Sequence, residues 1–168
     1  MSHDFASLLQ RDHHDLERAV DELLAPSTTL AQLRGTLDGV RLGLTAHAEA
    51  EDIVLYHAIA QCNAKGALQS LVDQARRAHL AQETALSALV CALPNTEAWR
   101  ERASYLRELV RAHARHEEAH VLPAIRELAP AEVYASLAGA FATQRLRQLA
   151  LLQPSAPIFL SDLAQQVG

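Results

Sequence analysis

Two His-x-x-x-Glu pairs could do chemistry, because each combines an imidazole with a carboxylate. They are His47 with Glu51 and His113 with Glu117, placed 66 positions apart in the chain. Side chains four positions apart on a helix share one face, so each pair can direct a nitrogen and an oxygen to the same point. Imidazole suits iron, zinc, copper and nickel, carboxylates can bridge two such ions, and calcium or magnesium would require an all-oxygen shell. The pairs therefore predict a transition-metal site.

Two more histidines, His13 and His79, are separated by the same 66 positions. Like the two pairs, they fall on core-facing positions in apolar series that advance by three and four residues. A single His-x-x-x-Glu could be an exposed ion pair, and a single histidine could be an ordinary core residue. Six such residues related by one offset favour a dinuclear metal site over a metal-free polar network. The predicted metal ligands are His13, His47, Glu51, His79, His113 and Glu117.

Helices must position these residues, because alanine and leucine dominate the chain while β-branched and aromatic residues are few. The common offset indicates two copies of a helical hairpin, each with one histidine on its first helix and a His-x-x-x-Glu pair on its second. We predict an all-α fold: an antiparallel up-down four-helix bundle with an additional C-terminal helix. The predicted helices span about 4–24, 29–62, 67–92, 97–122 and 130–152.

Length and charge narrow the remaining possibilities. With 168 residues, 49% of them hydrophobic, the chain is long enough to bury one core. We expect a bundle over residues 1–128 and a helix and tail over 129–168 packed on the same domain. A net charge of -5 without a basic block argues against nucleic acid and membrane surfaces as partners. Two cysteines outside any CxxC pair, and no signal-peptide or membrane-spanning pattern, predict a cytoplasmic protein.

The ligand motifs resemble those of hemerythrin-like HHE cation-binding domains. Asp12-His13-His14-Asp15-Leu16 is similar to the first-helix motif of that family, and the stretches 47–56 and 113–123 resemble its two HxxxEE segments. His79 stands where the third helix supplies a histidine. The resemblance covers about residues 4–125. It implies a non-haem di-iron centre, with two iron ions bridged by Glu51 and Glu117.

One departure from the oxygen-carrying members of the family bears on function. Their third helix supplies two histidines four positions apart, whereas here Glu83 follows His79 at that spacing. The resulting set of four histidines and two glutamates is similar to that of bacterial iron-centre repair proteins and of an iron-sensing ubiquitin-ligase subunit. Two histidines per iron would leave more coordination positions open to water, dioxygen or another small molecule.

Several neighbouring residues have alternative roles. Glu83 could join the ligands or be solvated, and His120, on the expected core-facing series, could line an access path or bond to a carbonyl in the core. Gln82 replaces Leu16 in the repeat, and its amide could hydrogen-bond a metal-bound water or ligand. His116 is interpreted as a flanking residue. Tyr56 and Tyr105 are predicted to be packing residues.

These observations leave four functional hypotheses. The first is a di-iron protein that binds, senses or reduces small oxidants such as O2, peroxide or NO, or takes part in iron handling. The second is a reversible O2 carrier. The third, a ferritin-like oxidase or iron store, is disfavoured because such sites use more carboxylates and Glu-x-x-His spacing. The fourth is a structural bundle with zinc or no metal. Whether the protein is an enzyme, and which protein partner it has, are not decided by the sequence.

Overall fold

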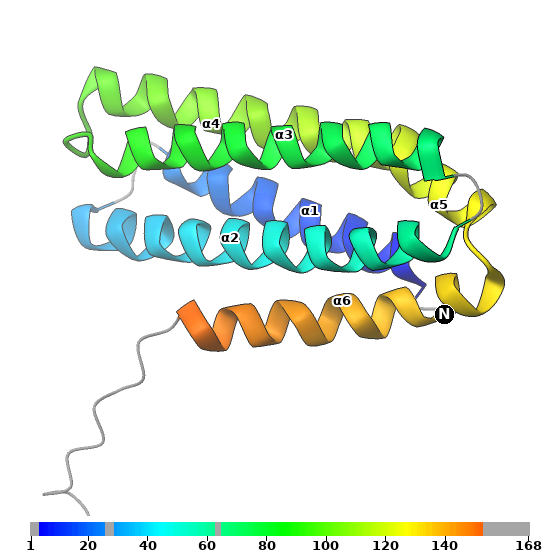
Figure 1. Ribbon diagram of the computed structural model, residues 1–168. Helices are drawn as coiled ribbons and strands as arrows, with labels where there is room; N and C mark the ends of the chain where they lie inside the picture. The colour runs from blue at the N-terminus through cyan, green and yellow to red at the C-terminus, as the bar shows by residue number, and fades with distance from the viewer. Residues whose placement is uncertain (1–3, 26–28, 63–64, 153–168) are drawn as a thin grey trace, which may run out of the picture.

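Helices make up the part of the chain described by the computed structural model, which covers residues 4–25, 29–62 and 65–152. No strand occurs among these residues, so the predicted all-α fold is confirmed (Figure 1). The helical segments, in order, are α1 (Phe5–Leu23), α2 (Leu30–Gln61), α3 (Lys65–Val90), α4 (Glu97–His116), the π-helical turn η1 (Glu117–Val121), α5 (Leu122–Leu128) and α6 (Ala131–Leu152).

Local signals in the sequence set the helix ends. Thr29 accepts a hydrogen bond from the backbone N–H of Gln32, and the Gln32 side chain accepts one from the backbone N–H of Thr29, which completes a capping box. Thr96 caps α4 by accepting from the N–H of Trp99. Between α3 and α4, Asn95 adopts a φ of 65°, a left-handed conformation that asparagine tolerates better than most residues.

The first four helices form the predicted up-down bundle. Each of α1 to α3 contacts the helix that follows it, and α4 closes the bundle against α1. The additional helix α6 packs along α2 and also touches α1, on the side of α2 away from α3 (Figure 1). None of the described helices is long and apolar enough to cross a membrane. The expected tail from Pro154 lies outside the described residues.

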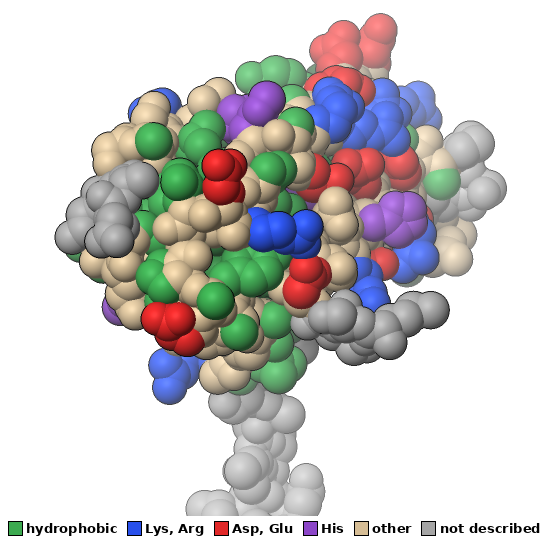
Figure 2. Space-filling view, turned by 90° about the vertical axis from the view of Figure 1, so that its right-hand side faces the viewer, with side chains coloured by type: hydrophobic (Ala, Val, Ile, Leu, Met, Phe, Trp, Pro, Cys, Tyr) green, Lys and Arg blue, Asp and Glu red, His purple; other side chains and the backbone are tan. Residues whose placement is uncertain are grey.

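Charges of both signs share the surface. At the end of the molecule shown in Figure 2, basic side chains lie beside aspartate and glutamate, and apolar patches separate the charged groups. Tyr56 and Tyr105 are 67% and 61% exposed, so the prediction that they are packing residues is wrong. Tyr56 follows the buried Leu55 by one residue and Tyr105 precedes the buried Leu106 by one residue, and a rotation of about 100° per residue carries both to the surface.

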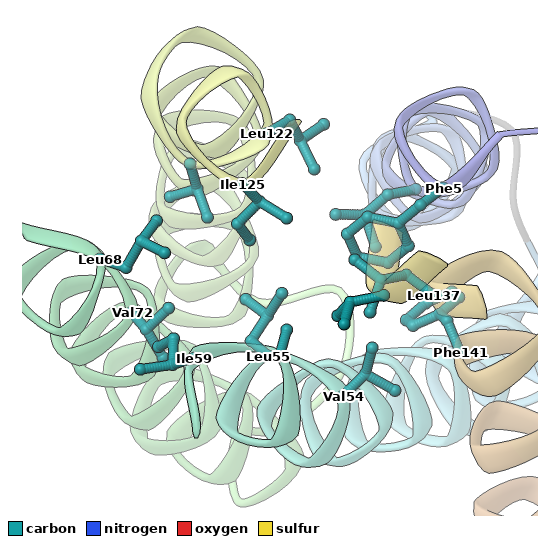
Figure 3. Packing of buried hydrophobic residues seen from close by; sticks show 14 of the residues in the cluster. Phe5, Val54, Leu55, Ile59, Leu68, Val72, Leu122, Ile125, Leu137 and Phe141 are labelled. Carbon is teal, nitrogen blue, oxygen red and sulfur yellow. The ribbon is translucent and has the colours of Figure 1, made fainter. Parts of the chain in front are cut away.

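Two apolar clusters fill the bundle, one on each side of the predicted ligands. The first, which we call the Phe5 cluster, joins α1, α2, α3, η1, α5 and α6 and contains Leu55, Ile125 and Phe141 (Figure 3). The second, the Trp99 cluster, fills the other half of the bundle. Along α1 the change from one to the other occurs between Leu9 and Leu16. His13 lies between them, so the polar ligands form a layer between two apolar cores.

The π-helical turn η1 changes the predicted course of the fourth helix. We expected the core-facing series to continue from Glu117 to His120, but His120 is exposed and Val121 is buried instead. The N–H of Leu122 bonds to the carbonyl of Glu117, five residues back, so this turn holds one more residue than an α-helical turn. The helix thereby passes Pro123 without stopping. The prediction that His120 occupies a core position is therefore wrong.

Candidate metal centre

All six predicted ligands meet in the layer between the two apolar clusters. The first helix supplies His13, α3 supplies His79, and the two His-x-x-x-Glu pairs come from α2 and from the junction of α4 with η1. Every one of the six is at most 6% exposed. The sequence pattern thus predicted that these side chains lie within reach of one another, although they come from five helical segments.

The four imidazoles form two pairs. The ring centroids of His79 and His113 are 4.5 Å apart, and those of His13 and His47 are 5.1 Å apart. The recorded distances between members of different pairs are longer, from 5.8 to 6.0 Å. This spacing defines two half-sites, one formed by His13 and His47 and the other by His79 and His113.

Each glutamate lies between the two half-sites. Oε2 of Glu51 is 3.2 Å from Nε2 of His47 and 3.7 Å from Nε2 of His79. Oε2 of Glu117 is 3.1 Å from Nε2 of His13 and 3.4 Å from Nε2 of His113. Both carboxylates therefore touch one histidine of each half-site, which is the placement that a pair of bridging carboxylates requires.

A second set of carboxylates binds the outer nitrogens of three histidines. Oxygens of Glu118 and Asp52 lie 3.0 and 3.1 Å from Nδ1 of His13 and His79, respectively. An oxygen of Asp12 lies 2.9 Å from Nδ1 of His47. Such partners fix the ring orientation and leave Nε2 free to bind a metal ion.

Sequence reasoning missed these outer partners. Asp52 and Glu118 follow the two glutamates directly and obey the 66-residue offset, so the repeat itself could have identified them. Asp12 has no acidic counterpart in the second repeat, where Ala78 stands. The helix α6 adds Arg145, whose Nε and Nη2 contact the two oxygens of Asp12 at 2.7 and 2.6 Å. No pattern near residue 145 indicated this contact.

Burial and close contact perturb the protonation of the cluster. Burial lowers the pKa of His47, but its contacts with Asp12 and Glu51 outweigh this and raise the pKa to about 9. Burial and the neighbouring Glu51 carboxylate raise the pKa of Glu117 well above its usual range. Burial also holds the pKa of His113 well below that of a free histidine. Without a further cation, the cluster must retain protons to offset its buried carboxylates.

The nitrogen and oxygen atoms of the six predicted ligands are better placed to bind metal ions than to hydrogen-bond one another. Nε2 of His13 and of His47 and all four carboxylate oxygens of Glu51 and Glu117 are buried without a hydrogen-bond partner. One ligand atom from each of these residues and His113 lies within 4.8 Å of all the others. His79 joins them through Nε2, 3.0 Å from Nε2 of His113. Buried nitrogen and oxygen atoms without a hydrogen-bond partner are unfavourable unless a cation binds them.

Residues next to the cluster divide into buried and exposed groups. Glu83 is exposed, and the group of ligand atoms within reach of one another does not include it. Gln82 is 4% exposed, as its core position predicted. His116 is half-buried and its ring lies 5.0 Å from that of His120 rather than against a predicted ligand.

Fold and site together define a four-helix bundle with an interior histidine and glutamate cluster able to hold metal ions. The model of the family described as Hemerythrin HHE cation binding domain matches residues 4–125, and the chain belongs to this family. No curated protein and no solved structure matches the chain. The matched region ends before α6, so Arg145 and Phe141 lie outside the domain that the family shares.

Proposed function

We propose that this protein is a non-haem di-iron protein that binds, senses or reduces small oxidants such as O2, peroxide or NO. In this proposal the six residues are metal ligands, with His13 and His47 on one iron, His79 and His113 on the other, and Glu51 and Glu117 between them. We also propose that the protein is cytoplasmic, in keeping with its two free cysteines. Its partners are small molecules rather than nucleic acid or membranes.

The observation that carries the proposal is the contact of each glutamate with one histidine from each half-site. A single-ion site would draw all donors to one centre, whereas two histidine pairs joined by two carboxylates suit two ions. A ligand set of imidazoles and carboxylates suits iron, which we favour here. Zinc also accepts these ligands. A bound pair of irons would supply two electrons to a small oxidant.

The chain's own residues supply orientation and exclusion of water. Asp52 and Glu118 hold the outer nitrogens of His79 and His13, which fixes the direction of Nε2 in each ring. The Phe5 and Trp99 clusters seal the layer from above and below. Every charge in the layer therefore acts at short range and with little screening by water.

Metal analysis of protein loaded with Fe2+ without oxygen tests the proposal. We expect about two irons per chain, and a visible absorption band after exposure to air. The double variant His47→Ala/His113→Ala should lose iron binding, because it removes one histidine from each half-site. His14→Ala/His57→Ala is the matched control, since both histidines are exposed on the same bundle.

The outcomes separate the alternatives. Rapid irreversible oxidation in air supports a reactive centre, whereas a long-lived reversible adduct would identify an O2 carrier. A colourless protein with one zinc or no metal per chain would overturn the proposal. Unchanged iron content in His47→Ala/His113→Ala would refute the ligand assignment.

A further inference from the structure

The two half-sites obey the internal repeat in most of their contacts. The contact of His13 with Glu117 corresponds to that of His79 with Glu51, and the contact of His13 with Glu118 to that of His79 with Asp52. Against this background the exceptions are informative. They are Asp12, replaced by Ala78, and Leu16, replaced by Gln82.

The half-site of His13 and His47 is covered by α6. The ring of Phe141 lies 5.9 Å from that of His47, and Arg145 forms an ion pair with Asp12, the partner of His47. Asp12, Phe141 and Arg145 line a hollow between α1 and α6, and none of the six predicted ligands lines it. Leu16 fills its position so closely that a Cβ on Gly43 would lie 2.9 Å from its Cδ2. The hollow on this side therefore does not reach the six predicted ligands.

The half-site of His79 and His113 opens toward a pocket instead. The pocket lies between α2 and α3, has a volume of about 180 Å³, and is lined by both His79 and Gln82. Ala78 leaves Nδ1 of His113 without the carboxylate that its counterpart His47 has. The helix α6 lies on the opposite side of α2 (Figure 1) and does not line this pocket.

Gln82 brings to this pocket a buried polar atom that lacks a partner. Its side chain is 4% exposed and its amide nitrogen donates to no acceptor in the structure. A buried N–H2 without an acceptor is unfavourable, and the repeat shows that leucine can take the same place in the fold. The amide is therefore suited to a ligand that brings a hydrogen-bond acceptor into the pocket.

Charges around the pocket restrict that ligand. Glu49, Asp52 and Glu83 line it together with one cation, Arg76, whose Nε is 3.7 Å from Asp52. Three carboxylates against one guanidinium disfavour the entry of an anion. A metal cation brings no acceptor for the Gln82 amide, so the class that meets both conditions is a small neutral molecule with an acceptor atom, such as dioxygen, hydrogen peroxide or nitric oxide.

We infer that such a neutral ligand enters between α2 and α3 and binds next to the half-site of His79 and His113, where it accepts a hydrogen bond from Nε2 of Gln82. The half-site of His13 and His47, closed by α6, holds its metal without taking up the ligand. Gln82 is thus a positioning residue for the ligand. This inference rests on the proposed di-iron function.

Two pairs of variants test the route and the residue, with nitric oxide as the probe of the Fe2+-loaded protein under anaerobic conditions. Ala48→Phe fills the α2–α3 pocket, and Ala142→Phe fills the α1–α6 hollow as its control. Gln82→Leu copies the residue at position 16, and Gln74→Leu changes an exposed glutamine on the same helix. Iron content is measured first for every variant, so that loss of the metal centre is distinguished from loss of ligand binding.

We expect Ala48→Phe to slow nitric oxide association at least about tenfold, and Ala142→Phe to leave it unchanged. Gln82→Leu should raise the dissociation rate by about three- to tenfold, the range of one hydrogen bond. It should also raise the melting temperature of the metal-free protein, because an unpartnered buried amide is removed. If Ala48→Phe does not fold, Gln82→Leu decides alone.

The inference is overturned if variants that retain two irons bind nitric oxide like the unmodified protein. It is also overturned if Ala142→Phe blocks association while Ala48→Phe does not. Failure of every variant, and of the unmodified chain, to load iron would instead refute the proposed function.

Discussion

Arg145→Met should weaken metal binding at one half-site, although residue 145 is not a ligand. Arg145 lies on α6 and holds both oxygens of Asp12, and Asp12 in turn lies 2.9 Å from Nδ1 of His47. Methionine keeps much of the apolar stem of the arginine but removes both charged contacts. The effect must then pass through Asp12 to His47.

The burial of this chain of contacts sets the size of the effect. The side chains of Asp12 and Arg145 are 11% and 25% exposed, so solvent screens their interaction only in part. Loss of an outer partner of a metal-binding histidine costs about 10- to 100-fold in metal affinity. Because Arg145 is one step further out than Asp12, we expect about a tenfold loss, or about 1.4 kcal/mol, for Arg145→Met. Asp12→Asn should cost more.

Competition against a chelator, with Co2+ as a visible stand-in for Fe2+, measures this affinity for each of the two ions. The titration should separate into two steps, with only one of them shifted in Arg145→Met. The double variant Arg145→Met/Asp12→Asn should bind no more weakly than Asp12→Asn, because both changes act through the same contact. Arg147→Met, an exposed arginine on the same helix, is the control.

Three results would refute the reasoning. They are an unchanged affinity in Arg145→Met, an equal loss in Arg147→Met, and an equal loss at both metal positions. The last would show that α6 merely supports the fold.

Two further predictions concern stability. The pKa of His47 is about 9 in the folded protein against 6.5 in the unfolded chain, so protonation of His47 stabilises the metal-free fold. This stabilisation is fully present below pH 6.5 and is lost as the pH rises through 9. Urea unfolding of metal-free protein should therefore lose up to about 3 kcal/mol between these pH values, and a flat profile would contradict the assignment. Gly35→Ala and Gly39→Ala should each raise the free energy of unfolding by about 0.5–1 kcal/mol, since an added Cβ meets no atom within 4 Å. Gly43→Ala is their control and should gain less, because its Cβ would meet Leu16 at 2.9 Å.

The sequence was sufficient for the helices and for the assembly of the six predicted ligands. Helix periodicity is local, so the positions of His47 and Glu51 on one face follow from their spacing alone. The 66-residue offset then related the second pair and the two single histidines without any knowledge of packing. Capping at Thr29 was equally local, and the structure places the helix start where it was predicted.

What could not be predicted depends on contacts between distant segments or on a change of helix type. The core-facing series beyond Glu117 was continued with α-helical steps, and the wider turn η1 moves Val121 inward in place of His120. Arg145 reaches Asp12 across 133 positions of sequence. Asp12 bonds to Nδ1 of His47, and its second partner, Arg145, comes from α6.

The separation of the core into the Phe5 and Trp99 clusters bears on how the protein unfolds. The clusters share no residue, and the layer that joins them holds groups with unpartnered donors and raised or lowered pKa values. Without metal, the layer joins the helices through the contacts of Glu118, Asp12 and Asp52 with the histidines. Bound ions would add ligand bonds from four helices at this level, so we expect metal loading to raise the free energy of unfolding of both ends of the bundle together.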